Sequence, residues 1–215
     1  LLALGLLAWR LPATPPVAAN AAQKRTPLAR MDARVRLPQL TALLAMISVT
    51  IAQVTVGFFA IDRLALDAAA GARMAGIALT AVGLGLILAQ VLVMKLDVHP
   101  RRWIALGALI GGLGFASVAA VQQPWQLPAA YAIAAFGMGF VFPSFQALAA
   151  DAVEPHEQGA AAGTVAAAQG VGMVVGPMLG TLLYRANASL PYLMVGVLLL
   201  LLCALALAHR RAEAA

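Results

Sequence analysis

Charged side chains are scarce in this sequence: Asp, Glu, Lys and Arg make up 10% of its 215 residues. Soluble domains carry about 25% charged residues, and their cores are too small to bury a chain that is 63% hydrophobic. The single cysteine, Cys203, lies inside an apolar run. This excludes an internal disulfide framework and a cysteine-based metal site. The composition therefore predicts an integral membrane protein, whose apolar surface the lipid bilayer solvates.

The basic residues are the next feature, because the net charge is +6. They lie between apolar blocks rather than in one tract or on one face, which is typical of membrane topology and not of nucleic-acid binding. A membrane enzyme would need His, Asp, Glu or Cys clustered at one depth, and the sequence has no such cluster. We therefore expect no enzyme, no metal, no cofactor and no nucleic-acid partner.

Six apolar segments are each about 20 residues or slightly longer, enough to cross about 30 Å of hydrocarbon as a helix. They are Leu40–Phe59, Met74–Met94, Trp103–Val121, Leu127–Ala150, Ala160–Tyr184 and Leu190–Ala208. None contains a charged residue, and none alternates as the strands of a membrane barrel do. The sequence thus predicts an all-α membrane protein with a six-helix transmembrane bundle.

The chain divides into four predicted parts. Residues 1–10 resemble the end of a truncated transmembrane helix, since Leu1–Ala8 is too short to span a bilayer. Residues 11–37 form a basic linker rich in proline, residues 38–209 form the six-helix half-domain, and residues 210–215 form a C-terminal tail. We expect the chain to be a fragment that lacks an N-terminal six-helix half.

The distribution of Lys and Arg predicts the orientation. If the linker is cytoplasmic, the inner segments contain Arg10, Lys24, Arg25, Arg30, Arg34, Arg36, Lys95, Arg101, Arg102, Arg210 and Arg211. The outer segments contain Arg63, Arg73 and Arg185. Cytoplasmic loops are enriched in Lys and Arg, so we expect the linker and the C-terminus in the cytoplasm, in a bacterial cytoplasmic membrane.

The fifth apolar segment contains the most informative motif: Gly163, Gly172, Gly176, Pro177 and Gly180, followed by Thr181. Gly172, Gly176 and Gly180 recur every four residues, which places them on one face where a neighbouring helix can approach closely. Gly163 lies nine residues before Gly172, about half a turn out of phase, and faces elsewhere. Pro177 cannot donate to the carbonyl of Met173, so the helix should bend there. Ordinary transmembrane packing would also explain the glycines.

This spacing resembles the pattern G-x8-G-x3-G-P-x2-G-G of drug:proton antiporters in the major facilitator superfamily, with Thr181 in place of the last glycine. A basic linker followed by six helices also resembles the C-terminal half of such transporters, helices 7–12. The tetracycline and multidrug exporter branch is the most similar. The resemblance implies alternating-access transport of a small solute, with proton-coupled efflux of hydrophobic or amphipathic compounds as the leading hypothesis. An uptake facilitator or symporter of the same superfamily is the alternative, and a membrane sensor that does not transport is a third hypothesis.

Two loops add to the resemblance. Glu157, Gln158 and Gly159, followed by Gly163, are similar to the Gln-Gly-x3-Gly of these exporters at the cytoplasmic entrance of helix 11. Helix capping explains the acidic residues there, and a gating contact with a basic loop is the alternative. Asp97, Arg101 and Arg102 resemble the family's D-x-x-G-R loop, with Pro100 in place of glycine. Such a loop could latch one cytoplasmic state, or it could simply follow the positive-inside rule.

The fourth segment contains Gly139 and Pro143, which predict either a hinge near mid-membrane or a static kink. A substrate cavity on this half would have mostly apolar walls, with Gln53, Phe59, Phe140 and Gln146 as candidate contacts. Proton coupling needs an ionisable group within the membrane, and none of the six apolar segments contains an acidic residue. We therefore expect a coupling carboxylate in the N-terminal half, unless the protein is not proton-coupled.

Overall fold

The computed structural model describes residues 32–213, and the side chains of residues 32–208. The predicted helix end at 1–10, most of the linker predicted at 11–37 and the predicted tail at 210–215 therefore have no described side chains. The last residues of that linker are already helical. Asp32 caps the short 3-10 helix η1 (Ala33–Val35), and the first long helix begins at Arg36.

The described residues form six long helices and no strand. They are α2 (Arg36–Asp62), α3 (Ala68–Lys95), α4 (Pro100–Val118), α5 (Gln126–Asp151), α6 (Gln158–Ala186) and α7 (Leu190–Glu213). Each predicted apolar segment lies within one helix, except that α4 ends three residues before Val121. The predicted all-α class and the six-helix bundle are thus confirmed.

Five of these helices are long and apolar enough to cross a membrane. The exception is α4, which has 19 residues. Arg101 and Arg102 in its first turn, together with four glycines, lower its mean hydropathy. In the bundle α4 contacts α5 and α7 along its length, so it belongs to the same transmembrane layer. The chain is a multi-pass integral membrane protein.

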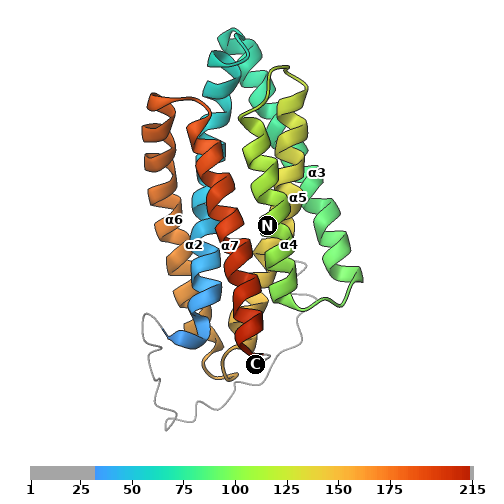
Figure 1. Ribbon diagram of the computed structural model, residues 1–215, viewed down its shortest axis with the longest axis vertical. Coiled ribbons are helices and arrows are strands. Elements are labelled where there is room, and N and C mark those ends of the chain that lie inside the picture. The colour runs from blue at the N-terminus through green and yellow to red at the C-terminus, as the bar shows by residue number, and fades with distance from the viewer. Residues whose placement is uncertain (1–31, 214–215) are drawn as a thin grey trace, which may run out of the picture.

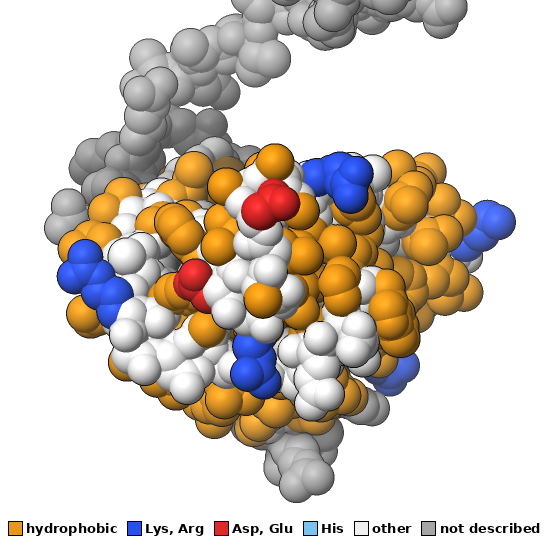
Figure 2. Space-filling view, turned by 90° about the horizontal axis from the view of Figure 1, so that it is seen from above, with side chains coloured by type: hydrophobic (Ala, Val, Ile, Leu, Met, Phe, Trp, Pro, Cys, Tyr) orange, Lys and Arg blue, Asp and Glu red, His pale blue; other side chains and the backbone are white. Residues whose placement is uncertain are grey.

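Consecutive helices run in opposite directions, because short connections join them (Figure 1). The helices α2, α4 and α6 therefore begin at the same end of the bundle. We call it the Arg34 end; it lies at the bottom of Figure 1. Figure 2 shows the opposite end, whose surface is mainly hydrophobic or uncharged, with a few separate basic and acidic side chains.

The interior of the bundle lies between α2, α4, α5 and α7. Its large, fully buried side chains include Ile51, Phe59, Tyr131, Tyr192 and Leu199. The two outermost helices are α3 and α6: in their most apolar stretches only 17% and 22% of residues are buried, against 61% in α5. Two long helices thus expose most of their surface to lipid or to another part of the protein.

Small residues hold α4 close to its neighbours. A Cβ added to Gly114 would lie 2.5 Å from the backbone nitrogen of Ala134 in α5, and one added to Gly112 would lie 3.2 Å from the carbonyl of Gly196 in α7. The contact at Gly114 leaves no room for a side chain and the one at Gly112 is tight, so the helix backbones lie close together. This packing is typical of helices in lipid, where close van der Waals contact replaces the hydrophobic effect.

Candidate functional site

The glycine ridge of α6, which we define as Gly172, Gly176 and Gly180, lies against α2. A Cβ added to Gly172 would lie 2.8 Å from Cβ of Met46 and 2.9 Å from the carbonyl oxygen of Leu43. One added to Gly180 would lie 3.3 Å from Cα of Ile51. Four-residue spacing therefore places three glycines on the face that contacts α2, as the sequence predicts.

Gly176 makes the tightest contact of the ridge. Its added Cβ would overlap with the Thr50 hydroxyl and would lie 3.0 Å from the carbonyl oxygen of Ile47. The Thr50 hydroxyl donates to the carbonyl of Met46 at 2.8 Å and lies 3.4 Å from the carbonyl of Gly172. A polar group thus lies inside the α2–α6 contact, next to the Gly-Pro step.

The other members of the helical motif lie elsewhere on α6. Gly163 is exposed, and an added Cβ would meet nothing within 4 Å. Pro177 lies inside the helix, and Thr181 donates to the Pro177 carbonyl at 2.8 Å. Gly163 therefore faces away from α2, while Pro177 interrupts the helical hydrogen bonds beside the ridge.

The predicted hinge of α5 lies against α3. Pro143 is inside the helix, and a Cβ added to Gly139 would lie 2.5 Å from Cβ of Ala89. Ser144 donates to the carbonyl of Phe140 at 2.6 Å, one residue after the carbonyl that Pro143 leaves without its helical donor. The structure thus places Gly139 at the α3–α5 interface and Pro143 one turn further along α5; whether the helix bends there remains a prediction.

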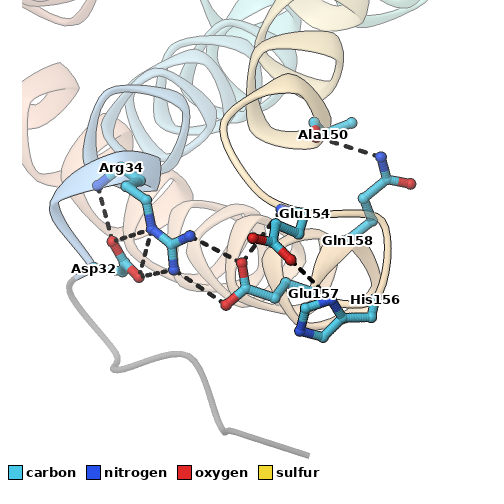
Figure 3. Close-up of polar contacts among 7 residues, drawn as sticks. All are labelled: Asp32, Arg34, Ala150, Glu154, His156, Glu157 and Gln158. Atoms are coloured by element: carbon cyan, nitrogen blue, oxygen red, sulfur yellow. Dashed lines mark hydrogen bonds and ion pairs between the residues drawn. The ribbon is translucent and has the colours of Figure 1, made fainter. Parts of the chain in front are cut away.

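An ion-pair cluster lies at the Arg34 end, where η1 meets the start of α6 (Figure 3). Its members, Asp32, Arg34 and Glu157, are separated by up to 125 residues in the sequence. The guanidinium of Arg34 lies 2.8 Å from Asp32 Oδ2 and 2.9 Å from Glu157 Oε2. Its second contact with Glu157 is 3.2 Å, which makes this pair bidentate.

Hydrogen bonds from Arg34 hold the pKa values of Asp32 and Glu157 below their ordinary values. Glu157 is 14% exposed and accepts a further bond from the backbone nitrogen of Glu154, at 3.3 Å. It makes no side-chain capping bond to α6. Glu157 thus lies at the N-terminus of α6 and also contacts a basic segment; whether that contact gates transport remains a prediction.

The remaining predicted loop residues lie at the same end of the bundle as this cluster. Gln158 donates to the carbonyl of Ala150 at 3.4 Å, and Gly159 has open space where a Cβ would be. Asp97 is exposed in the loop before α4, and Arg102 is exposed in the first turn of α4.

Arg101 of this loop lies near the cluster. It lines a cavity of about 390 Å³ together with Arg34 and Asp151. The structure thus brings the Asp97–Arg102 loop and the Glu157 loop to the same end of the bundle, although 55 residues separate Arg102 from Glu157.

A hydroxyl network that sequence reasoning missed crosses the buried interior. Thr55 of α2 lies 3.1 Å from the Tyr192 hydroxyl of α7, which lies 3.0 Å from the Tyr131 hydroxyl of α5. Tyr131 donates to the carbonyl of Ala52 at 2.7 Å. Three helices are therefore joined by polar contacts within the apolar core. Tyrosines that fall inside apolar segments were the available signal, because a buried phenol needs a partner.

The four predicted cavity contacts do not lie together. Gln53 is exposed and lines a small apolar cavity of about 110 Å³, and Gln146 is exposed in a separate groove between α5 and α6. Phe59 and Phe140 are instead buried within the bundle. Phe59 contacts the ring of Tyr192, and Phe140 stacks on Trp103 with ring centroids 4.6 Å apart. Both rings gain aromatic contacts inside the bundle, which explains why they are buried there.

No group of three or more His, Cys, Asp or Glu among the described residues could hold a metal ion. The described candidate site therefore consists of a glycine ridge, two helices interrupted by proline, and an ion-pair cluster at one end of the bundle.

Comparisons with known proteins identify a family and a relative of the chain. The family model described as Major Facilitator Superfamily matches residues 40–215. A tetracycline resistance protein, class G, of Vibrio anguillarum is 33% identical over 107 residues. This match covers 48% of the chain and 27% of that protein, so the chain spans only part of the relative's length.

Proposed function

The chain belongs to the Major Facilitator Superfamily, and we propose that it is one six-helix half of a transporter that exports hydrophobic or amphipathic solutes in exchange for protons. In this proposal a second six-helix half supplies the opposing bundle, and we call the two halves together the complete transporter. The contact of the glycine ridge with α2 is the observation on which the proposal chiefly rests.

The ridge supports alternating access for a physical reason. Backbones that touch through glycine can slide or bend with little loss of side-chain packing, and Pro177 removes one helical hydrogen bond at the same level. Gly139 and Pro143 repeat this combination on α5. Two helices that both contact α2 could therefore change shape as the halves rock around a central site.

The substrate class follows from the surface that the half exposes. Many of the exposed large residues on α3 and α6 are apolar, and the exposed polar side chains within the spans are uncharged, as Gln53 and Gln146 are. Such a surface fits an amphipathic solute better than a sugar or a multiply charged anion. The tetracycline resistance relative makes tetracycline the first compound to test.

Proton coupling is assigned in this proposal to the second half, since no acidic residue lies within the six apolar segments. The Arg34 end would face the cytoplasm of a bacterial cell, because basic residues gather there. The cluster of Arg34 and Glu157 would then be a contact of the cytoplasmic side, formed in one state of the transport cycle.

Everted vesicles that contain the complete transporter test the proposal. We expect an imposed pH gradient to drive accumulation of tetracycline or of a fluorescent hydrophobic cation, and a protonophore to abolish it. Accumulation that does not depend on the pH gradient would argue against proton coupling and favour facilitated transport. Accumulation only in right-side-out vesicles would instead favour the uptake alternative.

A further inference from the structure

Three glutamines line one groove between α5 and α6 near the Arg34 end. They are Gln146 of α5 and Gln158 and Gln169 of α6, and the groove has a volume of about 480 Å³. Its other walls are alanines and Val165. Small side chains keep the groove wide, and its volume falls within the ~300–1,000 Å³ typical of sites for small molecules.

The amide groups of the groove have few partners within the protein. In the part of the chain that the structure describes, the side chains of Gln146 and Gln169 form no hydrogen bond, and Gln158 forms one long bond of 3.4 Å to Ala150. An amide offers two donors and an acceptor. Because Gln146 and Gln158 are exposed and Gln169 is half-buried, these amides are available to bind a partner from outside the chain.

The groove also leads from the end of the bundle toward its middle. Gln158 is the first residue of α6, and Gln169 lies 11 residues further along, which is about 16 Å of helix. Gln146 lies five residues before the end of α5, at about 8 Å. The three amides are thus spaced along a path into the membrane, and no charged side chain lines it.

We infer that this groove binds the uncharged, hydrogen-bonding edge of an amphipathic solute, with Gln146 and Gln169 as the residues that recognise it. The inference rests on the proposed transport function and narrows its substrate class. Recognition would come from neutral hydrogen bonds and not from an ion pair, because the lining supplies amides and small apolar groups only.

Two probes separate these forms of recognition in the complete transporter. Tetracycline presents hydroxyl and keto groups along one edge, whereas tetraphenylphosphonium is a lipophilic cation without hydrogen-bonding groups. For the double variant Gln146→Leu/Gln169→Leu we expect the Kd of tetracycline to rise about tenfold, the loss of one or two neutral hydrogen bonds. The Kd of tetraphenylphosphonium should stay the same.

The matched control is Gln90→Leu, which replaces an exposed glutamine of α3 outside the groove. A rise in Kd for Gln90→Leu as large as that for the double variant would overturn the inference. An unchanged Kd of tetracycline in the double variant would also overturn it, as would an equal rise in the Kd of both probes. If the double variant fails to fold, Ala166→Phe, which fills the groove, must weaken tetracycline binding for the inference to stand.

The binding measurement also separates the two proposals. If the wild-type protein binds tetracycline through Gln146 and Gln169 but does not transport it, the groove assignment would stand and the proposed transport function would be wrong. A wild-type protein that does not bind tetracycline would overturn the groove assignment, even where it transports the cation.

Discussion

Gly176 of α6 lies directly against Thr50 of α2, so close that a methyl group at Gly176 would overlap with the Thr50 hydroxyl. The two residues are 126 positions apart in the sequence. Because of this contact, the fold requires a residue without a side chain at position 176. The glycines of α6 differ in how closely they approach α2, so their replacement should cost different amounts of stability.

Alanine at Gly172 or Gly176 should destabilise the protein by about 1–3 kcal/mol, the usual cost of overpacking. Both added methyl groups would meet backbone atoms of α2 at 3.0 Å or less, and backbone cannot move aside cheaply. Gly180→Ala should cost less, because its nearest contact is 3.3 Å. Thermal unfolding of the purified variants would measure the series.

Gly163→Ala is the matched control for this series. It adds the same methyl group to the same helix where nothing lies within 4 Å, so we expect a gain of about 0.5–1 kcal/mol from helix propensity. Equal losses of stability at Gly163 and Gly176 would show that contact with α2 is not the cause.

Glu157→Gln should weaken the ion-pair cluster in a pH-dependent manner. Arg34 lowers the pKa of the folded-state carboxyl below its ordinary value of 4.5. The stabilisation by the charged pair is therefore present above pH 4.5 and is lost as the pH falls through the lowered pKa. The difference in Tm between wild type and Glu157→Gln should be constant near neutral pH and should shrink in acid.

Glu154→Gln is the control for that experiment, since Glu154 contacts His156 at 3.4 Å and its side chain does not contact Arg34.

The charge exchange Arg34→Glu with Glu157→Arg extends the test to transport. If each single variant transports more slowly and the double exchange restores the transport rate, the ion pair takes part in the transport cycle. If the double variant transports as slowly as the single variants, the pair has no such role.

Removing the hydroxyl of Tyr192 should cost about 0.5–1.5 kcal/mol, because Tyr192→Phe leaves Thr55 and Tyr131 each with one contact fewer. Tyr131→Phe should cost a similar amount, and the double variant less than the sum, since the two hydroxyls contact each other. Chemical or thermal unfolding of the two single variants and the double variant would complete the double-mutant cycle. Strictly additive losses of stability would argue against a coupled network.

Pro143→Ala restores a backbone donor for the carbonyl of Gly139, so it should stiffen α5 and lower the maximal transport rate of the complete transporter with little effect on KM. Pro128→Ala is the control. Pro128 is the third residue of α5, where a backbone N–H has no helical acceptor in any case. Equal rates for wild type and Pro143→Ala would favour a static kink.

The 215-residue chain by itself should not catalyse transport, because one six-helix bundle has no opposing bundle to rock against. Vesicles that contain only this chain should show no saturable, gradient-driven flux of tetracycline above protein-free vesicles. Saturable flux would mean that this bundle, alone or as an oligomer, forms a complete pathway.

The amino-acid sequence by itself determined the membrane location, the six helices and the face of the glycine ridge. These features depend on local quantities: the length and hydropathy of each segment, and the four-residue spacing of Gly172, Gly176 and Gly180 on one helix. The helix ends lie up to six residues from the predicted ones, because hydropathy does not fix the residue at which a helix begins.

Only the tertiary structure decided which helices meet and which side chains become partners. The pairs Arg34–Glu157 and Tyr131–Tyr192 join residues 123 and 61 positions apart, and nothing in the local pattern selects them. Phe59 became core while Gln146 came to line a groove, because the packing of all six helices decides whether a side chain has a neighbour. Hydropathy places a residue within the membrane but does not distinguish the face buried in protein from the face left open, since lipid and protein interior are similarly apolar.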